Sequence, residues 1–272
     1  MNTNGPLTLK LKLIDEHRIF DKAAGLNEPS GLTLNADGTA LYTVSDDTKA
    51  VFCLDLKGRM NVSDSFFIGV DDLEGIAISA DGRQLLMVQE ETNAIVTADL
   101  ESRREISRRP LAGMENYSSI SHLFPNPPDN KGLEGITVNT RNNHIFVVKE
   151  GRPGVLIEVS EDQSTILQSR LLSAENGFAH PSVGPEKLDF SGLSYDAQRD
   201  TIWITSDKGQ CLFHYDWQED RVLQRLDLTT EDHGKGRIRK SEGVAIDPVR
   251  NRLYVVSERD GRLYVYKIHD KS

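Results

Sequence analysis

The sequence has few of the residues on which disulfide-rich and zinc-binding proteins depend. Its 272 residues include only two cysteines, Cys53 and Cys211, too few for a disulfide scaffold or a cysteine-based zinc site. Apolar runs are short as well, and none approaches the roughly 18 residues that a membrane-spanning helix requires. The first residues lack the basic flank and apolar block of a secretory signal. We therefore expect a globular protein with no membrane span in this chain.

Positive charge is also in deficit. Lysine and arginine total 32 against 42 aspartate and glutamate residues, which gives a formal net charge of −10. A surface of this sign repels phosphate backbones, so we expect no nucleic-acid partner. A cation site would draw on the same excess of carboxylates, which by itself indicates only a soluble protein.

One short phrase occurs five times along the chain. It is anchored on a glycine, which recurs at intervals of 44 to 60 residues. The five copies begin EPSGLTLN, DLEGIAIS, GLEGITVN, DFSGLSYD and KSEGVAID, with the glycines at Gly31, Gly75, Gly135, Gly192 and Gly243. This period is too long for ankyrin or tetratricopeptide units and is typical of a four-stranded propeller blade.

Each copy contains alternating and β-branched segments separated by turn residues, a pattern that indicates strands. The fifth copy ends near Ile268 without a fourth strand, and the segment from Leu7 to Ile19 can supply it. Pairing these two ends would remove two exposed sheet edges. The sequence therefore predicts an all-β fold, a five-bladed β-propeller closed by the N-terminal strand, as a single domain over residues 1–272. We expect the long connections 114–131 and 173–187 to be loops inserted within blades.

Acidic residues recur at equivalent places in the repeats. The second strand of each copy is followed by an acid, and three copies have a glutamate directly before the anchoring glycine. The first set is Asp46, Glu90, Glu150, Asp207 and Glu258, and the second is Glu74, Glu134 and Glu242. Strands that alternate in direction bring both positions to one face of the ring, so these eight carboxylates should surround one channel mouth. The alternative is that each acid only ends a strand at a solvated edge.

Carboxylates that converge in this way need compensating charge, because like charges raise one another's pKa. Oxygen ligands without histidine or cysteine favour a hard divalent cation, Ca²⁺ first and Mg²⁺ as the alternative. Lysines near the same face could neutralise the acids or contact an anionic ligand; these are Lys131, Lys149, Lys187 and Lys240.

With the copies aligned, the chain resembles the SdiA-regulated family, the YjiK-like bacterial β-propellers related to esterase-like phytases and calcium-regulated propeller proteins. DLEGIAIS, GLEGITVN, DFSGLSYD and SEGVAIDPVRNRLYVVSE carry the resemblance. It implies a periplasmic or membrane-associated protein with a Ca²⁺ link, whereas a chain that is complete as given would be cytoplasmic. The matching positions are Glu74, Glu134, Glu242, Glu90, Glu150 and Glu258, whereas Ser30 and Ser191 replace the glutamate in two copies.

Three functions remain open from the sequence. The first is a Ca²⁺-binding propeller that acts as a ligand-binding or regulatory module, with an anionic small molecule or a protein as further partner. The second is a metal-dependent, phytase-like phosphoesterase in which the cation polarises a phosphoryl oxygen and activates water. The third is a metal-free interaction scaffold.

Overall fold

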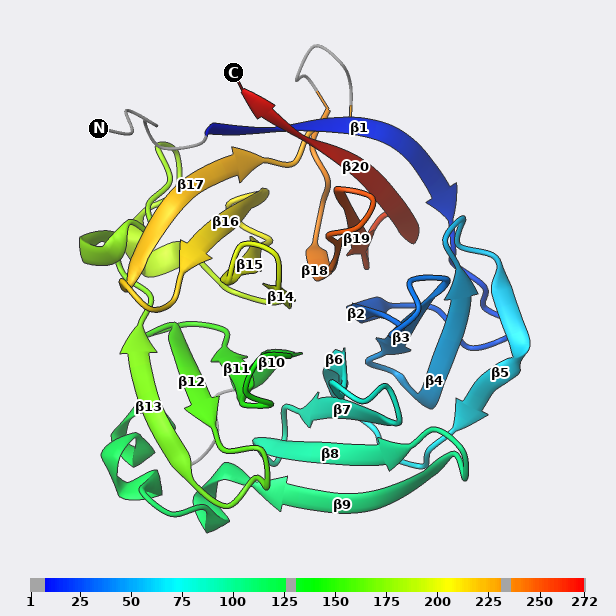
Figure 1. Cartoon of the computed structure of the whole chain (residues 1–272), viewed down its shortest axis with the longest axis horizontal. Helices are drawn as coiled ribbons and strands as arrows, with labels where there is room; N and C mark the ends of the chain where they lie inside the picture. Colours follow the sequence, from blue (N-terminus) through cyan, green and yellow to red (C-terminus); the bar gives the residue numbers. More distant parts are fainter. Residues whose placement is uncertain (1–7, 126–130, 231–235, 272) are drawn as a thin grey trace.

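The protein forms five four-stranded antiparallel sheets arranged as blades around a central channel (Figure 1). This arrangement was obtained as a computed structural model, which describes residues 8–125, 131–230 and 236–271. The prediction of a five-bladed β-propeller closed by the N-terminal strand is confirmed. Leu7, the first residue of the predicted closing strand, lies outside the described residues.

Each blade is a meander whose first strand lines the channel and whose fourth lies at the rim. Blade 1 contains β2 (Pro29–Leu34), β3 (Ala40–Ser45), β4 (Thr48–Asp55) and β5 (Met60–Phe67). Blade 2 contains β6 (Leu73–Ile78), β7 (Gln84–Gln89), β8 (Ala94–Asp99) and β9 (Arg104–Pro110). Blade 3 contains β10 (Leu133–Val138), β11 (Ile145–Lys149), β12 (Val155–Val159) and β13 (Ile166–Leu171). Blade 4 contains β14 (Leu193–Asp196), β15 (Thr201–Ser206), β16 (Cys211–Asp216) and β17 (Arg221–Asp227).

Blade 5 is built from both ends of the chain. It contains β18 (Ser241–Asp247), β19 (Arg252–Ser257) and β20 (Arg262–Lys271), and its outer strand is β1 (Thr8–Arg18). Leu9 of β1 is buried against this blade, and its backbone N–H and carbonyl both bond the side-chain amide of Gln224 on β17 at 2.8 Å. The closing strand is therefore attached to blade 4 as well as to blade 5.

Short 3-10 helices lie in the connections between blades. They are η1 (Leu111–Gly113), η2 (Tyr117–Ser119) and η3 (Ser121–Leu123) before β10, and η4 (Ala174–Asn176) and η5 (Pro185–Lys187) before β14. The two long segments predicted to be inserted within blades in fact connect blade 2 to blade 3 and blade 3 to blade 4. The prediction was wrong because the repeat phrase begins at the inner strand, so a segment after the outer strand already lies between two sheets. Among the described residues, no helix is long and apolar enough to cross a membrane.

The hydrophobic core lies between neighbouring blades. Five clusters of buried side chains each combine residues from two adjacent sheets, as where Leu41 and Phe52 of blade 1 meet Tyr254 of blade 5. The inner strands approach even more closely at the repeated glycines. A Cβ atom on Gly135 would lie 2.0 Å from the carbonyl oxygen of Ser191 in the next blade, and one on Gly243 would lie 2.5 Å from that of Ser30. The phrase therefore repeats glycine because a side chain there would collide with the neighbouring backbone.

Candidate functional site at the acidic end of the channel

One end of the central channel opens into a cavity of about 370 Å³ that is lined almost entirely by charged side chains. The inner strands contribute residues from their first positions, and the second strands contribute residues from the turns that follow them. All eight predicted acids line this cavity, as Asp46, Glu74, Glu90, Glu134, Glu150, Asp207, Glu242 and Glu258. The alternating strand directions thus bring the two aligned sets of acids together, as the repeat predicts.

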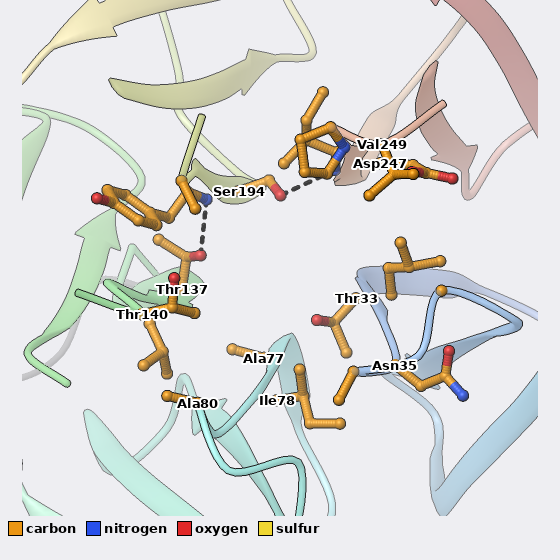
Figure 2. A pocket seen from close by; sticks show the side chains of 18 of the residues that line it. Thr33, Asn35, Ala77, Ile78, Ala80, Thr137, Thr140, Ser194, Asp247 and Val249 are labelled. Atoms are coloured by element: carbon orange, nitrogen blue, oxygen red, sulfur yellow. Dashed lines mark hydrogen bonds between the residues drawn. The ribbon is translucent and has the colours of Figure 1, made fainter. Parts of the chain in front are cut away.

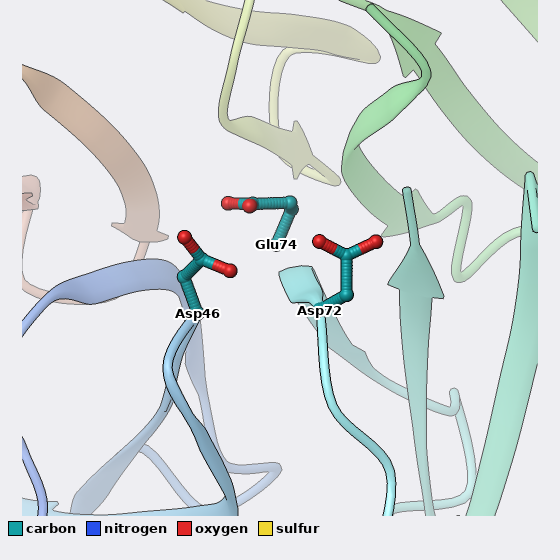
Figure 3. Close-up of side chains that lie close together, drawn as sticks. All are labelled: Asp46, Asp72 and Glu74. Carbon is teal, nitrogen blue, oxygen red and sulfur yellow. The ribbon is translucent and has the colours of Figure 1, made fainter. Parts of the chain in front are cut away.

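The tightest group of carboxylates lies between blades 1 and 2. One oxygen each of Asp46, Asp72 and Glu74 can be chosen so that all lie within 4.8 Å of one another. Asp46 follows β3, Asp72 directly precedes β6, and Glu74 belongs to β6. Figure 3 shows the three carboxylates close together, with Asp46 from blade 1 and Asp72 and Glu74 from blade 2.

Glu74 is held in place by the neighbouring blade. The hydroxyl of Ser30 donates a hydrogen bond of 2.6 Å to its carboxylate. Burial nevertheless raises the pKa of Glu74 to about 8; the Ser30 hydrogen bond opposes this shift, while the charges of Asp46 and Glu90 add to it. Burial also raises the pKa of Asp46, followed by repulsion from Asp72 and Glu258. Protons or a metal cation would stabilise this group.

Lysines neutralise the acids on the other side of the cavity. Lys131 contacts Glu150 at 2.6 Å, and Lys208 contacts Asp189 at 3.2 Å. Lys240 forms an ion pair with Glu258. Burial opposes the charge of Lys240, yet its bond to Glu258 and the nearby acids outweigh burial and raise the pKa of this lysine. Each of blades 3 to 5 therefore has one acid paired with a lysine, whereas the group of Asp46, Asp72 and Glu74 between blades 1 and 2 forms no ion pair with a lysine among the described residues.

Two further glutamates lie deep in the cavity. Among the described residues, neither Glu134 nor Glu242 has a hydrogen-bond donor or an ion-pair partner for its carboxylate within bonding distance. Burial, followed by repulsion from Glu74 and Glu242, raises the pKa of Glu134 well above its usual value. Burial and repulsion from Asp207 raise that of Glu242 to about 8. Glu90 differs, because it accepts a hydrogen bond of 2.9 Å from the backbone N–H of Gly132.

Two acids and one lysine of this cavity were not predicted from the sequence. Asp72 and Asp189 stand two residues before the aligned Glu74 and Ser191, a third repeated position that the alignment of copies could have revealed. Lys208 lies in the turn after β15, next to Asp207. Of the lysines expected near this face, Lys149 is buried away from the cavity, where its ammonium donates to the carbonyl of Gly151 at 2.6 Å, and Lys187 is exposed and does not line it.

The donor set can be tested against a divalent cation. Ca²⁺ binds oxygen ligands at about 2.3–2.6 Å, so two ligands of one ion lie at most about 5 Å apart. The separation within the Asp46, Asp72 and Glu74 group satisfies this limit. Carboxylates from two blades give irregular geometry, which Ca²⁺ accepts more readily than Mg²⁺. These residues therefore fit a calcium ion.

Fold and site together define a five-bladed propeller with an acidic channel mouth. The chain belongs to the SdiA-regulated family, whose model matches residues 16–267. The comparison therefore confirms the resemblance drawn from the repeat phrases. A search of curated proteins gives no match.

Solved structures agree on the architecture. A glutaminyl cyclase from Myxococcus xanthus is similar with a TM-score of 0.68 and 13% identity, over 98% of this chain and 100% of that one. The Cps50 (Swd1) propeller domain from Myceliophteria thermophila has a TM-score of 0.54 and 12% identity, over 94% and 99% of the two chains. A chain of a nidogen/laminin complex has a TM-score of 0.51 and 14% identity, over 89% and 84%. At these identities the likeness describes the fold alone.

Proposed function

We propose that the protein is a divalent-cation-binding propeller, with Ca²⁺ as the preferred ion, that acts as a ligand-binding or regulatory module. One observation carries this proposal: Asp46, Asp72 and Glu74 bring three carboxylates within the span of a single ion, and none of the three forms an ion pair with a described lysine. Glu134 and Glu242 add carboxylates that lack hydrogen-bond donors among the described residues. A bound cation would relieve the repulsion that this arrangement imposes on the apo protein.

A second candidate function is a metal-dependent phosphoesterase. The observation that favours it is the set of lysines across the same cavity, Lys131, Lys208 and Lys240, which could contact phosphoryl oxygens while the cation polarises the ester. Each of these lysines already forms an ion pair with an acid. They therefore offer less free positive charge than a phosphate would require, and the binding module is the better supported function.

Calorimetric titration of Ca²⁺ into chelator-stripped protein tests the proposal. Asp72→Asn removes one charge from the three-carboxylate group and should weaken Ca²⁺ binding at least tenfold. Glu150→Gln is the matched control, because Glu150 lines the same cavity but is neutralised by Lys131, and it should change the affinity less than threefold. Absence of binding heat in the unmodified protein would overturn the proposal and favour a metal-free scaffold. Equal effects of both substitutions would overturn the assignment of the site to the group of Asp46, Asp72 and Glu74. Metal-dependent hydrolysis of phosphate esters would instead promote the enzyme.

A further inference from the structure

The opposite end of the channel contains a second cavity, of about 350 Å³, with a different chemistry (Figure 2). Its volume lies in the range of about 300–1,000 Å³ that small-molecule sites occupy. Thr33, Ala77, Thr137 and Ser194 line it from four inner strands, each two residues after the repeated glycine of its blade. Small side chains at this position keep the centre of the ring open.

Three of these positions carry hydroxyl groups. Oγ1 of Thr137 accepts a hydrogen bond of 2.9 Å from the backbone N–H of Tyr195, and Oγ of Ser194 accepts one of 3.0 Å from that of Ile246. Because both oxygens accept, their own O–H groups remain available to donate. The Thr33 hydroxyl forms no hydrogen bond with any described residue, and in Figure 2 it points toward the open middle of the cavity. The channel wall thus presents three hydroxyl donors to a single space.

Charged side chains around this cavity are largely engaged with protein groups. Arg250 contacts Asp247 at 2.8 Å and also donates to the carbonyl of Gly38 at 2.9 Å. Asp37 lies in an exposed turn, where its carboxylate accepts from the backbone N–H of Thr39 at 3.0 Å. An anion would find no free cation among the described lining residues, and a cation would find far fewer carboxylates than at the acidic end.

The other lining residues include aliphatic ones, Leu34, Ile78, Val138 and Ile246, together with Tyr195 and the polar Asn35, Ser79 and Thr140. Apolar walls with a few convergent polar groups are the usual composition of a small-molecule site. We infer that this cavity binds a small uncharged molecule that has a hydrogen-bond-accepting oxygen at one end and an apolar body. The hydroxyls of Thr33, Thr137 and Ser194 are the donors that the cavity offers to this oxygen, and the body lies against the aliphatic residues. This site is separate from the proposed cation site and does not depend on it.

A charge series of equal chain length tests the inference. Hexanamide, hexanoate and hexylamine are titrated into chelator-treated protein carrying ¹³C-labelled isoleucine methyl groups, and the signals of Ile78 and Ile246 are followed. Hexanamide should shift both signals saturably with a Kd on the order of 1 mM, as expected for a ligand of this size. Hexanoate and hexylamine should bind at least fivefold more weakly. No saturable shift with hexanamide, or equal binding of all three compounds, would overturn the inference.

Two substitutions locate the binding. Thr33→Leu fills the open middle of the cavity without breaking a hydrogen bond, and it should weaken hexanamide binding at least tenfold. Thr229→Leu is the matched control, because Thr229 is also a half-buried threonine whose hydroxyl bonds no described residue, and it lies outside this cavity. It should leave the affinity unchanged. Unaltered binding in a folded Thr33→Leu protein would place the ligand elsewhere and refute the assignment.

Discussion

The hydroxyl of Ser30 donates a hydrogen bond of 2.6 Å to the carboxylate of Glu74 and so connects blade 1 to blade 2 at the proposed cation site. The bond favours the ionised form of Glu74 and fixes its direction toward Asp46 and Asp72. Ser30 stands where three other blades have glutamate. Serine in place of the repeated glutamate therefore supplies a hydrogen-bond donor at the point where the carboxylates lie closest together.

Ser30→Ala should weaken Ca²⁺ binding about tenfold. A hydrogen bond to a charged group contributes about 1.5–3 kcal/mol, and in the variant a water molecule bonded to Glu74 would replace part of this contribution. Ser191→Ala provides the control. Ser191 occupies the same repeat position, but its hydroxyl bonds Thr205 and the carbonyl of Ser241. Calorimetry should show that Ser191→Ala changes the Ca²⁺ affinity by less than about twofold, as expected for the removal of a small uncharged group that does not contact the cation site. Similar losses in both variants would mean that the Ser30 bond has no special role.

Cation binding should strengthen as pH rises. The pKa of Glu74 is about 8 in the metal-free protein, so at neutral pH a proton competes with the cation for this carboxylate. Between pH 6 and pH 8 the Ca²⁺ affinity should increase by about tenfold or more, with proton release that titrations in buffers of different ionisation enthalpy can count. An affinity independent of pH, without proton release, would contradict protonation of the site.

The same groups predict how stability depends on pH without metal. Glu74 and Glu242 have pKa values of about 8 in the folded chain against an ordinary 4.5. The folded state therefore binds protons more tightly, and this contribution is fully present below pH 4.5 and is lost as pH rises through about 8. In chelator, the free energy of unfolding should fall by at least about 1 kcal/mol between pH 6 and pH 8. Saturating Ca²⁺ should reduce this fall, which thermal melts can measure.

Lys240→Met should tighten Ca²⁺ binding by about threefold to tenfold at low salt, because the lysine charge repels a nearby cation. Lys240 is paired with Glu258 and also favours the charged forms of Glu242 and Glu74. Removing Lys240 should lower the melting temperature in chelator and increase the rise in melting temperature that Ca²⁺ produces. Lys57→Met serves as the control, because Lys57 is exposed in the turn between β4 and β5 and does not line the cavity. It should alter neither the Ca²⁺ affinity nor the melting temperature. Weaker Ca²⁺ binding in Lys240→Met would show that this lysine supports the site instead of opposing it.

Gly135→Ala should destabilise the protein by about 3 kcal/mol or prevent folding, since the new Cβ would lie 2.0 Å from the carbonyl oxygen of Ser191. Backbone atoms form this contact, so the neighbouring blade would have to move. Gly113→Ala is the matched control, because no atom of the described residues lies within 4 Å of its added Cβ, and it should be neutral within about 0.5 kcal/mol. Equal denaturation midpoints for the two variants would disprove the close packing of the inner strands.

The sequence repeat predicts the five blades and the face of the ring on which the acids lie. It does so because neighbouring strands run in opposite directions, which brings the aligned positions of all blades to the same end of the channel. It does not predict which of those acids meet. Asp72 reaches Asp46 and Glu74 from a backbone with a positive φ of 58°, a local conformation that no spacing rule indicates. Likewise, Lys208 of blade 4 approaches Glu150 of blade 3 at 3.8 Å. Such contacts depend on the geometry between blades, which the pattern within one copy does not encode.

The pairing of β1 with β20 also decides how the ring responds to mechanical load. The register places Thr8 opposite Lys271 and Arg18 opposite Arg262. The chain therefore enters β1 and leaves β20 at the same end of this strand pair. Force applied between the two ends would break the cross-strand bonds one pair at a time, as in unzipping, instead of loading all of them together in shear. A chain pulled from both ends would therefore separate β1 from β20 first, while the other four blades are still folded.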